Sequence, residues 1–389
     1  MNQRKLLTCC LQAFALAAAL TLTKMQAADS PDVKQVVARI RSHDFHPTDG
    51  GFTKDRTLKT AGVANLSDPD WKVRTLALRD MVRAGEGGFS ALIDALADDN
   101  VHVRYLATRA FGVQRAGAAV PGLERLLRED PDSTVRSQSA IALSQIGEKS
   151  SVAVVRAALE QDEDRDVKLQ AEIAIHSLEQ GKAATPELAA AFAHLDESDF
   201  GLAGVGEKAP DFSLTDTEGK AWKLSDFAGE NPVVLVWIFS VWCPVCHGEF
   251  NDLMNLRDEF EAAGIKVFTL ECHDDFAARV MVGKELAPDQ WLSRESFQKG
   301  YTERIWWPHL VDRAAAVGVK YDVQPMAFSV HAEYINRPTV AIVDKDGVLR
   351  FLYQGTFWGD RPTIHEILEM TKSGQYEYEA PKRLRSKTP

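Results

Sequence analysis

The pattern of apolar and polar positions divides the chain into two stretches that predict different kinds of domain. Between residues 61 and 195, apolar side chains recur at helical spacing, as Val73, Leu76 and Ala77 do. In the second half, apolar residues form continuous runs, and the run 233–239 is typical of a strand buried on both faces of a sheet. The sequence therefore predicts a multidomain protein in which an all-α domain is followed by an α/β domain.

A motif recurs about every 30 residues in the first half. Four Val residues, each followed by Arg or Lys, stand 30, 32 and 32 residues apart: Val73, Val103, Val135 and Val167. An Asp lies five residues before each Val, where it can cap or brace the next helix start, and a small residue one turn after it lets a neighbouring helix approach closely. Thr185 and Pro186 predict the start of a closing helix, because Pro is favoured at the first helical position.

This repeated stretch, residues 61–195, resembles HEAT repeats of the short bacterial type. The resemblance implies an α-solenoid with a polar ladder built from Asp68, Asp98, Asp130 and Asp162 with Arg74, Arg104 and Arg136. Lys168 departs from the pattern, since an ammonium group cannot offer the planar fork of a guanidinium. The resemblance also implies a surface for binding another macromolecule. A solenoid that only spaces or docks the second domain is the alternative.

The N-terminus predicts export. Residues 1–27 begin with basic residues, continue with an apolar run over 6–22 and end with a small residue, Ala27, at the expected cleavage site. These are the parts of a secretory signal peptide. We therefore expect a periplasmic or secreted protein that meets a membrane only through this peptide, if the peptide stays uncleaved.

Three further segments complete the predicted organisation. Residues 28–60 form an N-terminal segment, with a short helix over 33–40. Residues 196–205 are acidic and Gly-rich, as a linker between domains would be. Residues 376–389 form a polar tail.

Composition and charge narrow the classes of function. The chain has 56 acidic and 45 basic residues, a formal net charge of -11, which argues against a nucleic-acid binder with a broadly basic face. Of its five cysteines, three remain after cleavage of the signal peptide: Cys243, Cys246 and Cys272. Because three is an odd number, at least one thiol is free or pairs only transiently.

Two of these cysteines stand where a strand is predicted to meet a helix. Cys243 follows the apolar run 233–239, and Cys246 falls in the first turn of the helix. A thiolate at a helix N-terminus is stabilised by unpaired N–H groups and by the helix dipole, so we expect the pKa of Cys243 to be low. Cys243 would then attack a disulfide, Cys246 would resolve the mixed disulfide, and Trp242 would shield the pair.

Residues 206–375 resemble the thioredoxin-like redoxin family, especially its exported TlpA-like thiol–disulfide oxidoreductases. The motifs that carry the resemblance are GEKAPDF at 206–212, WCPVC at 242–246 and RPTV at 337–340. The resemblance implies an α/β thioredoxin-like fold and exchange of thiols with disulfides. It further implies protein substrates, an unidentified electron donor and no cofactor.

The resemblance also assigns roles to single residues. It implies a redox-active disulfide between Cys243 and Cys246, and a role in proton transfer for Glu249, three residues past the second cysteine. It implies that Pro338 is a cis-proline lying against the cysteine pair, where it holds extended substrate. The implied substrate contacts are Trp242, Pro244, Arg337 and Pro338. Trp237 stands where thioredoxin has a buried Asp, so deprotonation would need another helper such as Glu249.

The rest of the second half predicts further elements. Strands are expected over 265–270 and 306–312, and a helix over 314–323. Compared with thioredoxin, the segment 324–336 is an extra loop that would lie near the site, and 274–300 is a second expansion.

A thiol peroxidase is the nearest rival. Peroxiredoxins share the fold and carry Ser or Thr three residues before the reactive cysteine, as Ser240 stands before Cys243. They also need a Pro where Val236 stands and an Arg where Pro338 stands, with Arg337 one position away. Because two of the three landmarks are absent, we favour disulfide exchange.

The cysteines also fit other kinds of site. Residues 243–247 satisfy the c-type haem pattern, and Cys243, Cys246, Cys272 and His273 could ligate zinc. Because the first pair begins a helix and the second lacks a standard knuckle spacing, we predict neither haem nor metal. We favour a small buried hydrophobe over a third redox cysteine for Cys272. In a further alternative, the cysteines form a static disulfide in a non-catalytic binding module.

Overall fold

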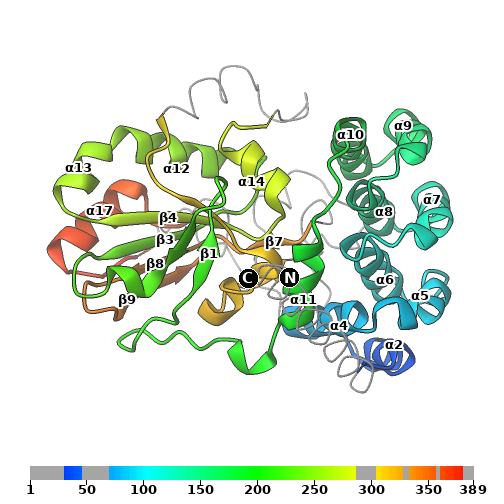
Figure 1. Cartoon of the computed structure of the whole chain (residues 1–389), viewed down its shortest axis with the longest axis horizontal. Helices are drawn as coiled ribbons and strands as arrows, with labels where there is room; N and C mark the ends of the chain where they lie inside the picture. Colours follow the sequence, from blue (N-terminus) through cyan, green and yellow to red (C-terminus); the bar gives the residue numbers. More distant parts are fainter. Residues whose placement is uncertain (1–29, 46–69, 286–303, 327–332, 356–359, 380–389) are drawn as a thin grey trace, which may run out of the picture.

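The protein consists of a helical N-terminal part and a C-terminal part built around a β-sheet (Figure 1). This computed structural model describes residues 30–45, 70–285, 304–326, 333–355 and 360–379. The predicted signal peptide, 1–27, lies outside the described residues. Within them, no helix has the length and apolar character needed to cross a membrane.

The helices of the N-terminal part stack in two rows, as the HEAT resemblance implied (Figure 1). The inner row, which faces the sheet, contains α4 (Trp71–Arg83), α6 (Val101–Val113), α8 (Ser133–Ile146) and α10 (Arg165–Gln180). The outer row contains α5 (Phe89–Ala95), α7 (Val120–Glu129) and α9 (Val152–Gln161). The 3-10 turns η1 (Gly85–Gly88), η2 (Gly117–Ala119) and η3 (Lys149–Ser151) lead into the outer helices.

The helix predicted over 33–40 is confirmed as α2 (Val33–Ser42). The side chain of Asp32 accepts a hydrogen bond from the Lys34 N–H and so caps its first turn. Four apolar residues on one face, Val33, Val36, Val37 and Ile40, are buried. This face packs on α4, α5 and α6, so α2 extends the solenoid beyond the predicted start at residue 61.

The polar ladder is confirmed at two steps. Arg104 donates to both carboxylate oxygens of Asp130, at 2.7 and 3.0 Å, and Arg136 does the same to Asp162, at 2.8 and 3.1 Å. Each Arg thus pairs with the Asp of the next repeat. The Asp residues brace their own turns by accepting an N–H two residues on, whereas the helix caps are Asn100, Asp132 and Asp164.

The first step of the ladder differs from the prediction. Asp98 accepts from Arg41 of α2, at 3.0 Å from its Nε, instead of from Arg74. Arg74 lies 3.8 Å from Asp70 in its own helix start, and its guanidinium stacks over Phe45. Asp68 lies outside the described residues. The extra helix α2 therefore supplies the arginine for the first complete repeat.

The closing helix forms as α11 (Pro186–His194), with Thr185 at its N-cap, but it does not stack after α10. It returns across the solenoid to α4, where Arg83 Nε donates to the Ala193 carbonyl at 2.6 Å. The Thr185 hydroxyl donates to Asp274 of the sheet domain at 2.9 Å, so it joins the two parts and does not cap its helix.

The C-terminal part is a mixed five-stranded sheet in the order β5-β4-β3-β8-β9. Strands β3 (Val233–Trp237), β4 (Lys266–Glu271) and β5 (His309–Val311) are parallel, while β8 (Thr339–Val343) and β9 (Leu349–Gln354) run antiparallel to their neighbours. The strands predicted in 233–239, 265–270 and 306–312 are confirmed. Two short hairpins flank the sheet: β1 (Ser213–Thr215) with β2 (Ala221–Lys223), and β6 (Pro325–Met326) with β7 (Ile335–Asn336).

Burial of β3 on both faces explains its continuous apolar run. Alternate residues such as Val234 and Val236 pack in the core that includes residues of α12 (Pro244–Asn255), α13 (Arg257–Ala262) and α17 (Ile364–Ser373). The intervening residues Leu235 and Trp237 pack on the opposite face. Because side chains alternate along a strand, both sets must be apolar.

The prediction of a helix over 314–323 is wrong. Two 3-10 turns stand there, η6 (Arg313–Ala315) and η7 (Gly318–Tyr321). Ala314 and Ala315 have φ values of 61° and 55°, which end any helix. The buried carboxylate of Asp312 accepts the N–H groups of Val317 and Gly318, both at 2.8 Å, and so replaces the carbonyl partners that a helix would supply. Within the expansion 274–300, the structure describes α14 (Asp275–Met281).

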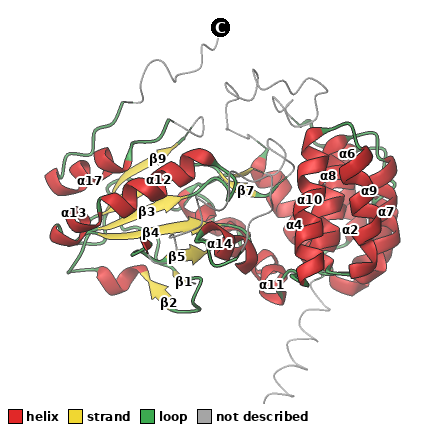
Figure 2. Cartoon of the chain, turned by 90° about the horizontal axis from the view of Figure 1, so that it is seen from above, coloured by secondary structure: helices red, strands yellow, loops and turns green. Residues whose placement is uncertain are grey.

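The two parts share one apolar core. Cys272, Ala314, Val319 and Tyr334 of the sheet domain are buried together with the inner helices of the solenoid. In Figure 2, α11, α14 and β7 lie where the two parts meet. The inner face of the solenoid is therefore covered by the second domain.

The predicted linker and the start of the predicted tail are both bound to the fold. In the linker, which includes the turn η4 (Glu197–Asp199), the Phe200 ring stacks on Trp71 of α4 at 5.2 Å, and Gly201 N–H donates to the Val319 carbonyl at 2.8 Å. In the tail, the Tyr378 hydroxyl donates to the Asp360 carbonyl at 2.8 Å. Residues beyond 379 lie outside the described part of the chain.

Candidate active site

The loop after β3 and the first turn of α12 carry the two cysteines, as predicted. Cys243 is the N-cap of α12 and Pro244 occupies its first position, where the missing N–H costs no hydrogen bond. Both thiols are free. Cys243 is 2% exposed and Cys246 is fully buried, whereas Pro244 is exposed and Trp242 half-buried. Cys243 is therefore the cysteine nearer to the surface.

The environment of Cys246 favours a thiolate. Its Sγ accepts a hydrogen bond from the Phe239 N–H at 3.2 Å, and Arg361 Nη2 lies 3.8 Å away. Burial alone would raise the pKa of this thiol, but the S–H of Cys243, the charge of Arg361 and the backbone N–H groups of Phe239 and Ser240 outweigh it and lower the pKa of Cys246 to about 6.

The pKa of Cys243 is raised well above its ordinary value, which differs from the expectation for a helix start. The main cause is that Cys243 donates its S–H to the Cys246 sulfur, and burial adds to the effect. The S–H of Cys243 points to the Cys246 sulfur, so the first proton lost belongs to the pair of thiols. The helix start is where we predicted it, but the pKa of Cys243 is raised there and not lowered.

Arg361, the cation of this site, was not found from the sequence. It lies between β9 and α17, and its side chain is 1% exposed. Its Nη1 donates to the Trp237 carbonyl at 2.7 Å, while Nη2 pairs with Glu249 and faces Cys246. No local motif marks an Arg that is separated from Cys246 by 115 residues.

Glu249 lies beside the dithiol, as the resemblance implied. Its carboxylate is buried and pairs with Arg361. Burial raises the pKa of Glu249 to about 8, although the charge of Arg361 opposes this shift. With a pKa of about 8, this carboxyl group is mostly protonated near neutral pH, and its role in proton transfer stays a prediction.

Pro338 lies at the same end of the sheet as the cysteines. It precedes Thr339, the first residue of β8, which pairs with Trp237 at the end of β3. The cis bond implied by the resemblance is not found. No peptide bond among the described residues is cis, so the Arg337–Pro338 bond is trans. The trans form is ordinarily favoured for an X–Pro bond, by about 0.5–1 kcal/mol. The substrate contact at Pro338 stays a prediction.

Arg337 does not face solvent. Its side chain is buried and its Nε donates to the Gly355 carbonyl at 2.6 Å. Burial lowers the pKa of this guanidinium. The contact indicates that Arg337 anchors the end of β9, and the substrate role implied by the resemblance stays a prediction.

The residues that would bind haem or zinc lie apart from one another or already form hydrogen bonds within the protein. His247 Nε2 donates to the Val241 carbonyl at 2.6 Å, and burial lowers the pKa of His247 to about 4. Cys272 donates its S–H to the Tyr334 carbonyl at 3.3 Å, in the core between the two domains. Burial raises the pKa of Cys272 well above its ordinary value. In the parts of the chain that the structure describes, no three His, Cys, Asp or Glu side chains gather as a metal site would need.

Glu333 is a second residue of the site that was not found from the sequence. Its side chain contacts the loop that carries the cysteines. Its Oε2 accepts hydrogen bonds from Trp242 Nε1 at 2.9 Å and from the Ser240 hydroxyl at 3.3 Å. The extra segment 324–336 was predicted to lie near the site, but no pattern singled out this carboxylate.

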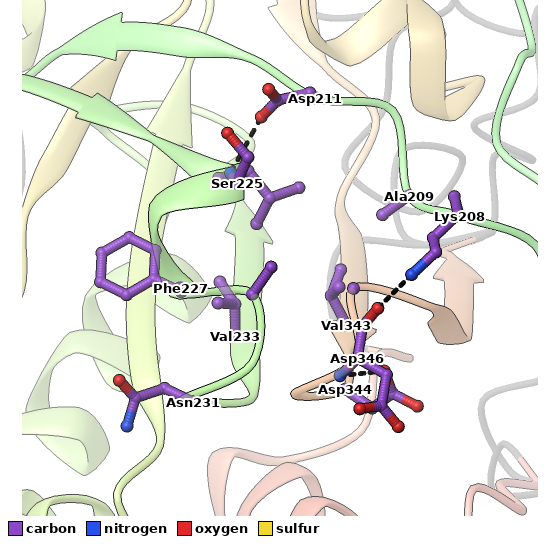
Figure 3. A pocket seen from close by; sticks show the side chains of 13 residues that line it. Lys208, Ala209, Asp211, Ser225, Phe227, Asn231, Val233, Val343, Asp344 and Asp346 are labelled. Carbon is purple, nitrogen blue, oxygen red and sulfur yellow. Dashed lines mark hydrogen bonds between the residues drawn. The ribbon is translucent and has the colours of Figure 1, made fainter.

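A cavity of about 140 Å³ lies at the opposite end of the sheet (Figure 3). It is lined where β3 begins at Val233 and β8 ends at Val343, a pair of residues opposed in the sheet. Lys208 Nζ donates to the Asp346 carbonyl at its rim. Because the cysteines follow the other end of β3, this cavity is separate from the dithiol.

The sheet and the dithiol at the start of α12 define an oxidoreductase of the thioredoxin-like class. Residues 205–352 match the model of the AhpC/TSA family, and residues 89–176 match that of HEAT repeats. Alkyl hydroperoxide reductase E of Mycobacterium tuberculosis is 30% identical over 154 residues, which cover 39% of this chain and 84% of that protein. Through its C-terminal domain, the chain belongs to the AhpC/TSA family.

Other relatives and solved structures match the same half. Thiol-disulfide oxidoreductase ResA of Bacillus subtilis is 26% identical over 170 residues, covering 44% of this chain and 77% of the relative. The ResA protein of Geobacillus kaustophilus is 28% identical over 168 residues, covering 43% and 78%. The reduced 2-Cys peroxiredoxin of Plasmodium vivax is similar with a TM-score of 0.35 and 16% identity, covering 44% of this chain and 81% of that one.

Proposed function

We propose that this protein is an exported thiol–disulfide oxidoreductase that acts on protein disulfides through Cys243 and Cys246. The observation that carries the proposal is the dithiol at the start of α12, where the Cys246 sulfur accepts from the Phe239 N–H at 3.2 Å and Arg361 Nη2 lies 3.8 Å away. The similarity to two ResA proteins named as thiol-disulfide oxidoreductases supports it.

In the proposed reaction, the Cys243 proton moves to Cys246, and the Cys243 thiolate attacks one sulfur of a substrate disulfide. The substrate S–S bond breaks, a mixed disulfide forms, and the departing thiolate takes a proton, for which Glu249 is the nearby donor. Cys246 then gives its proton to the Glu249 carboxylate and attacks the Cys243 sulfur, which breaks the bond between Cys243 and the substrate. The second substrate sulfur leaves as a thiolate and takes up a proton, and two electrons have passed from the dithiol to the substrate.

Cys243 is the attacking residue because access decides between the two sulfurs. Cys246 is fully buried, whereas Cys243 adjoins the exposed Pro244 and the half-buried Trp242. The oxidised pair must then be reduced again by an electron donor, which we expect to be a second protein dithiol. The two sulfurs carry both electrons, so the proposed reaction uses no cofactor.

Export is the second part of the proposal, and it rests on the signal-peptide pattern over 1–27. An oxidising compartment also contains the protein disulfides on which such an enzyme would act. We expect the intact mass of the protein secreted by an exporting host to match a chain that starts after Ala27 or Ala28. A secreted chain that retains Met1 would contradict cleavage.

For the solenoid, we propose that its inner face serves to dock the catalytic domain. The shared core and the bond between Thr185 and Asp274 support this role. A partner protein bound by the solenoid would then meet the outer helices α5, α7 and α9.

A thiol peroxidase is the second candidate, favoured by the similarity to a protein named alkyl hydroperoxide reductase E. The hydroxyl that would assist peroxide chemistry, that of Ser240, donates to Glu333. We expect the purified protein, supplied with dithiothreitol, to reduce insulin disulfides with a kcat/KM at least tenfold above that for hydrogen peroxide. A larger kcat/KM for peroxide would support the peroxidase instead.

A further inference from the structure

A buried carboxylate connects the solenoid to the loop that carries the cysteines. Glu333 lies just before β7 and is 9% exposed. Its Oε1 accepts a hydrogen bond from Gln170 Nε2 of α10 at 2.6 Å. Its Oε2 accepts from Trp242 and Ser240, at 2.9 and 3.3 Å. One side chain therefore joins the solenoid to the residues immediately before Cys243.

The chain next to Glu333 is fixed in both hydrophobic cores. The Tyr334 ring packs in the core of the solenoid, 5.1 Å from the ring of Phe192 and 4.6 Å from the guanidinium of Arg109. The Tyr334 hydroxyl donates to the Ala314 carbonyl at 3.0 Å. Ile335 packs in the other core, together with both cysteines. The two residues that follow Glu333 are thus anchored in both cores, which restricts where its side chain can lie.

The cysteine loop, in turn, depends on the residues that Glu333 holds. The Cys243 N–H donates to the Ser240 carbonyl at 3.1 Å, so the position of Ser240 sets that of Cys243. The Trp242 ring packs edge-on against Phe239 at 5.4 Å, and Phe239 N–H is the donor to Cys246. A shift of the indole would therefore reach both sulfurs.

We propose that Glu333 is a positioning residue for the dithiol, and that Gln170 makes the solenoid part of this support. The inference rests on the proposed thiol exchange and states how the exchanging loop is held. Without the Gln170 amide, one oxygen of a buried carboxylate loses a donor, and such a group rearranges to recover one. The same carboxylate accepts hydrogen bonds from Trp242 and Ser240, so a movement of the carboxylate would displace these two residues as well.

The test uses the full chain with Gln170→Leu, which keeps the size of the side chain and removes its amide. Gln180→Leu is the matched control, because Gln180 is exposed on the same helix and bonds His176 of that helix. Two quantities are measured: the NMR resonance of the Trp242 indole N–H, assigned by its loss in Trp242→Phe, and the rate of Cys243 alkylation, followed by mass spectrometry.

We expect Gln170→Leu to shift the indole resonance and to change the alkylation rate by about threefold to tenfold. Gln180→Leu should change neither. Glu333→Gln is the second variant, in case Gln170→Leu does not fold, and it should shift the same resonance because one amide oxygen cannot replace two carboxylate oxygens.

Wild-type values of both quantities in Gln170→Leu and in Glu333→Gln would overturn the proposal. Neither measurement needs a protein substrate. A protein that fails to reduce disulfides but shows the shift would therefore contradict the proposed function and leave Glu333 as a positioning residue.

Discussion

Replacing Cys243 with Ser should abolish disulfide reduction, whereas Cys246→Ser should accumulate mixed disulfides with its substrates. A serine hydroxyl at position 243 cannot replace the attacking thiolate. In Cys246→Ser, the attack still occurs but no second thiol releases the substrate. This variant also removes the thiolate that holds the Cys243 proton, so the pKa of Cys243 should fall and its alkylation at pH 7 should be faster than in the wild type.

Insulin reduction and mass spectrometry under non-reducing conditions measure these two outcomes. Cys272→Ala is the matched control, because this thiol lies in the core between the domains and outside the proposed reaction. Trapping by Cys243→Ser in place of Cys246→Ser would reverse the two roles. Unchanged turnover in both variants would refute the dithiol mechanism. A cysteine pair that resists mild reductant and never forms mixed disulfides would favour a non-catalytic binding module.

Replacing Arg361 with Met should raise the pKa at which the dithiol becomes reactive. Arg361 is the cation that stabilises the Cys246 thiolate, and burial raises the pKa of that thiol once the charge is gone. A shift from about 6 to about 8 would reduce the thiolate fraction at pH 7 roughly tenfold. The variant should also lose about 1.5–3 kcal/mol of unfolding free energy, because the buried hydrogen bond to the Trp237 carbonyl is lost.

The alkylation rate as a function of pH gives the first quantity, and urea unfolding gives the second. In the wild type the rate should rise through about pH 6, since the thiolate fraction grows as pH increases. Arg350→Met is the matched control, because Arg350 pairs with Asp344 at the other end of the sheet and is 42% exposed. An unshifted midpoint in Arg361→Met would show that the thiolate does not depend on this cation.

The pH dependence of stability follows from the same groups. The pKa of Cys246 is lower in the folded chain than its ordinary value, so this group adds stability as pH rises from about 6 toward 9. The pKa of Glu249 is raised to about 8, so this group removes stability as pH rises from about 4.5 to 8. The two contributions oppose each other between pH 6 and 8, which makes the alkylation midpoint the sharper test of Arg361.

Features with local causes were predicted well from the sequence. The run 233–239 becomes a strand buried on both faces, and Pro244 begins the helix that Cys243 caps. The recurring Asp and Arg form ladder steps because the solenoid repeats the same short-range geometry, as Arg104 and Asp130 show. Where a local conformation depends on a distant or buried partner, prediction fails. The residues after Asp312 form 3-10 turns because the buried Asp312 carboxylate accepts hydrogen bonds from the N–H groups of Val317 and Gly318.

The sequence by itself determined two domains, the order of their elements and the position of the dithiol at a helix start, since each follows from side-chain periodicity and spacing along the chain. Only the tertiary structure decided which groups raise or lower the pKa values of the two thiols. It brought Arg361 and Glu333 to the cysteines from distant segments, and it placed the inner face of the solenoid against the catalytic domain. Electrostatic effects act through space, and spacing along the chain does not reveal which charges meet in a buried core.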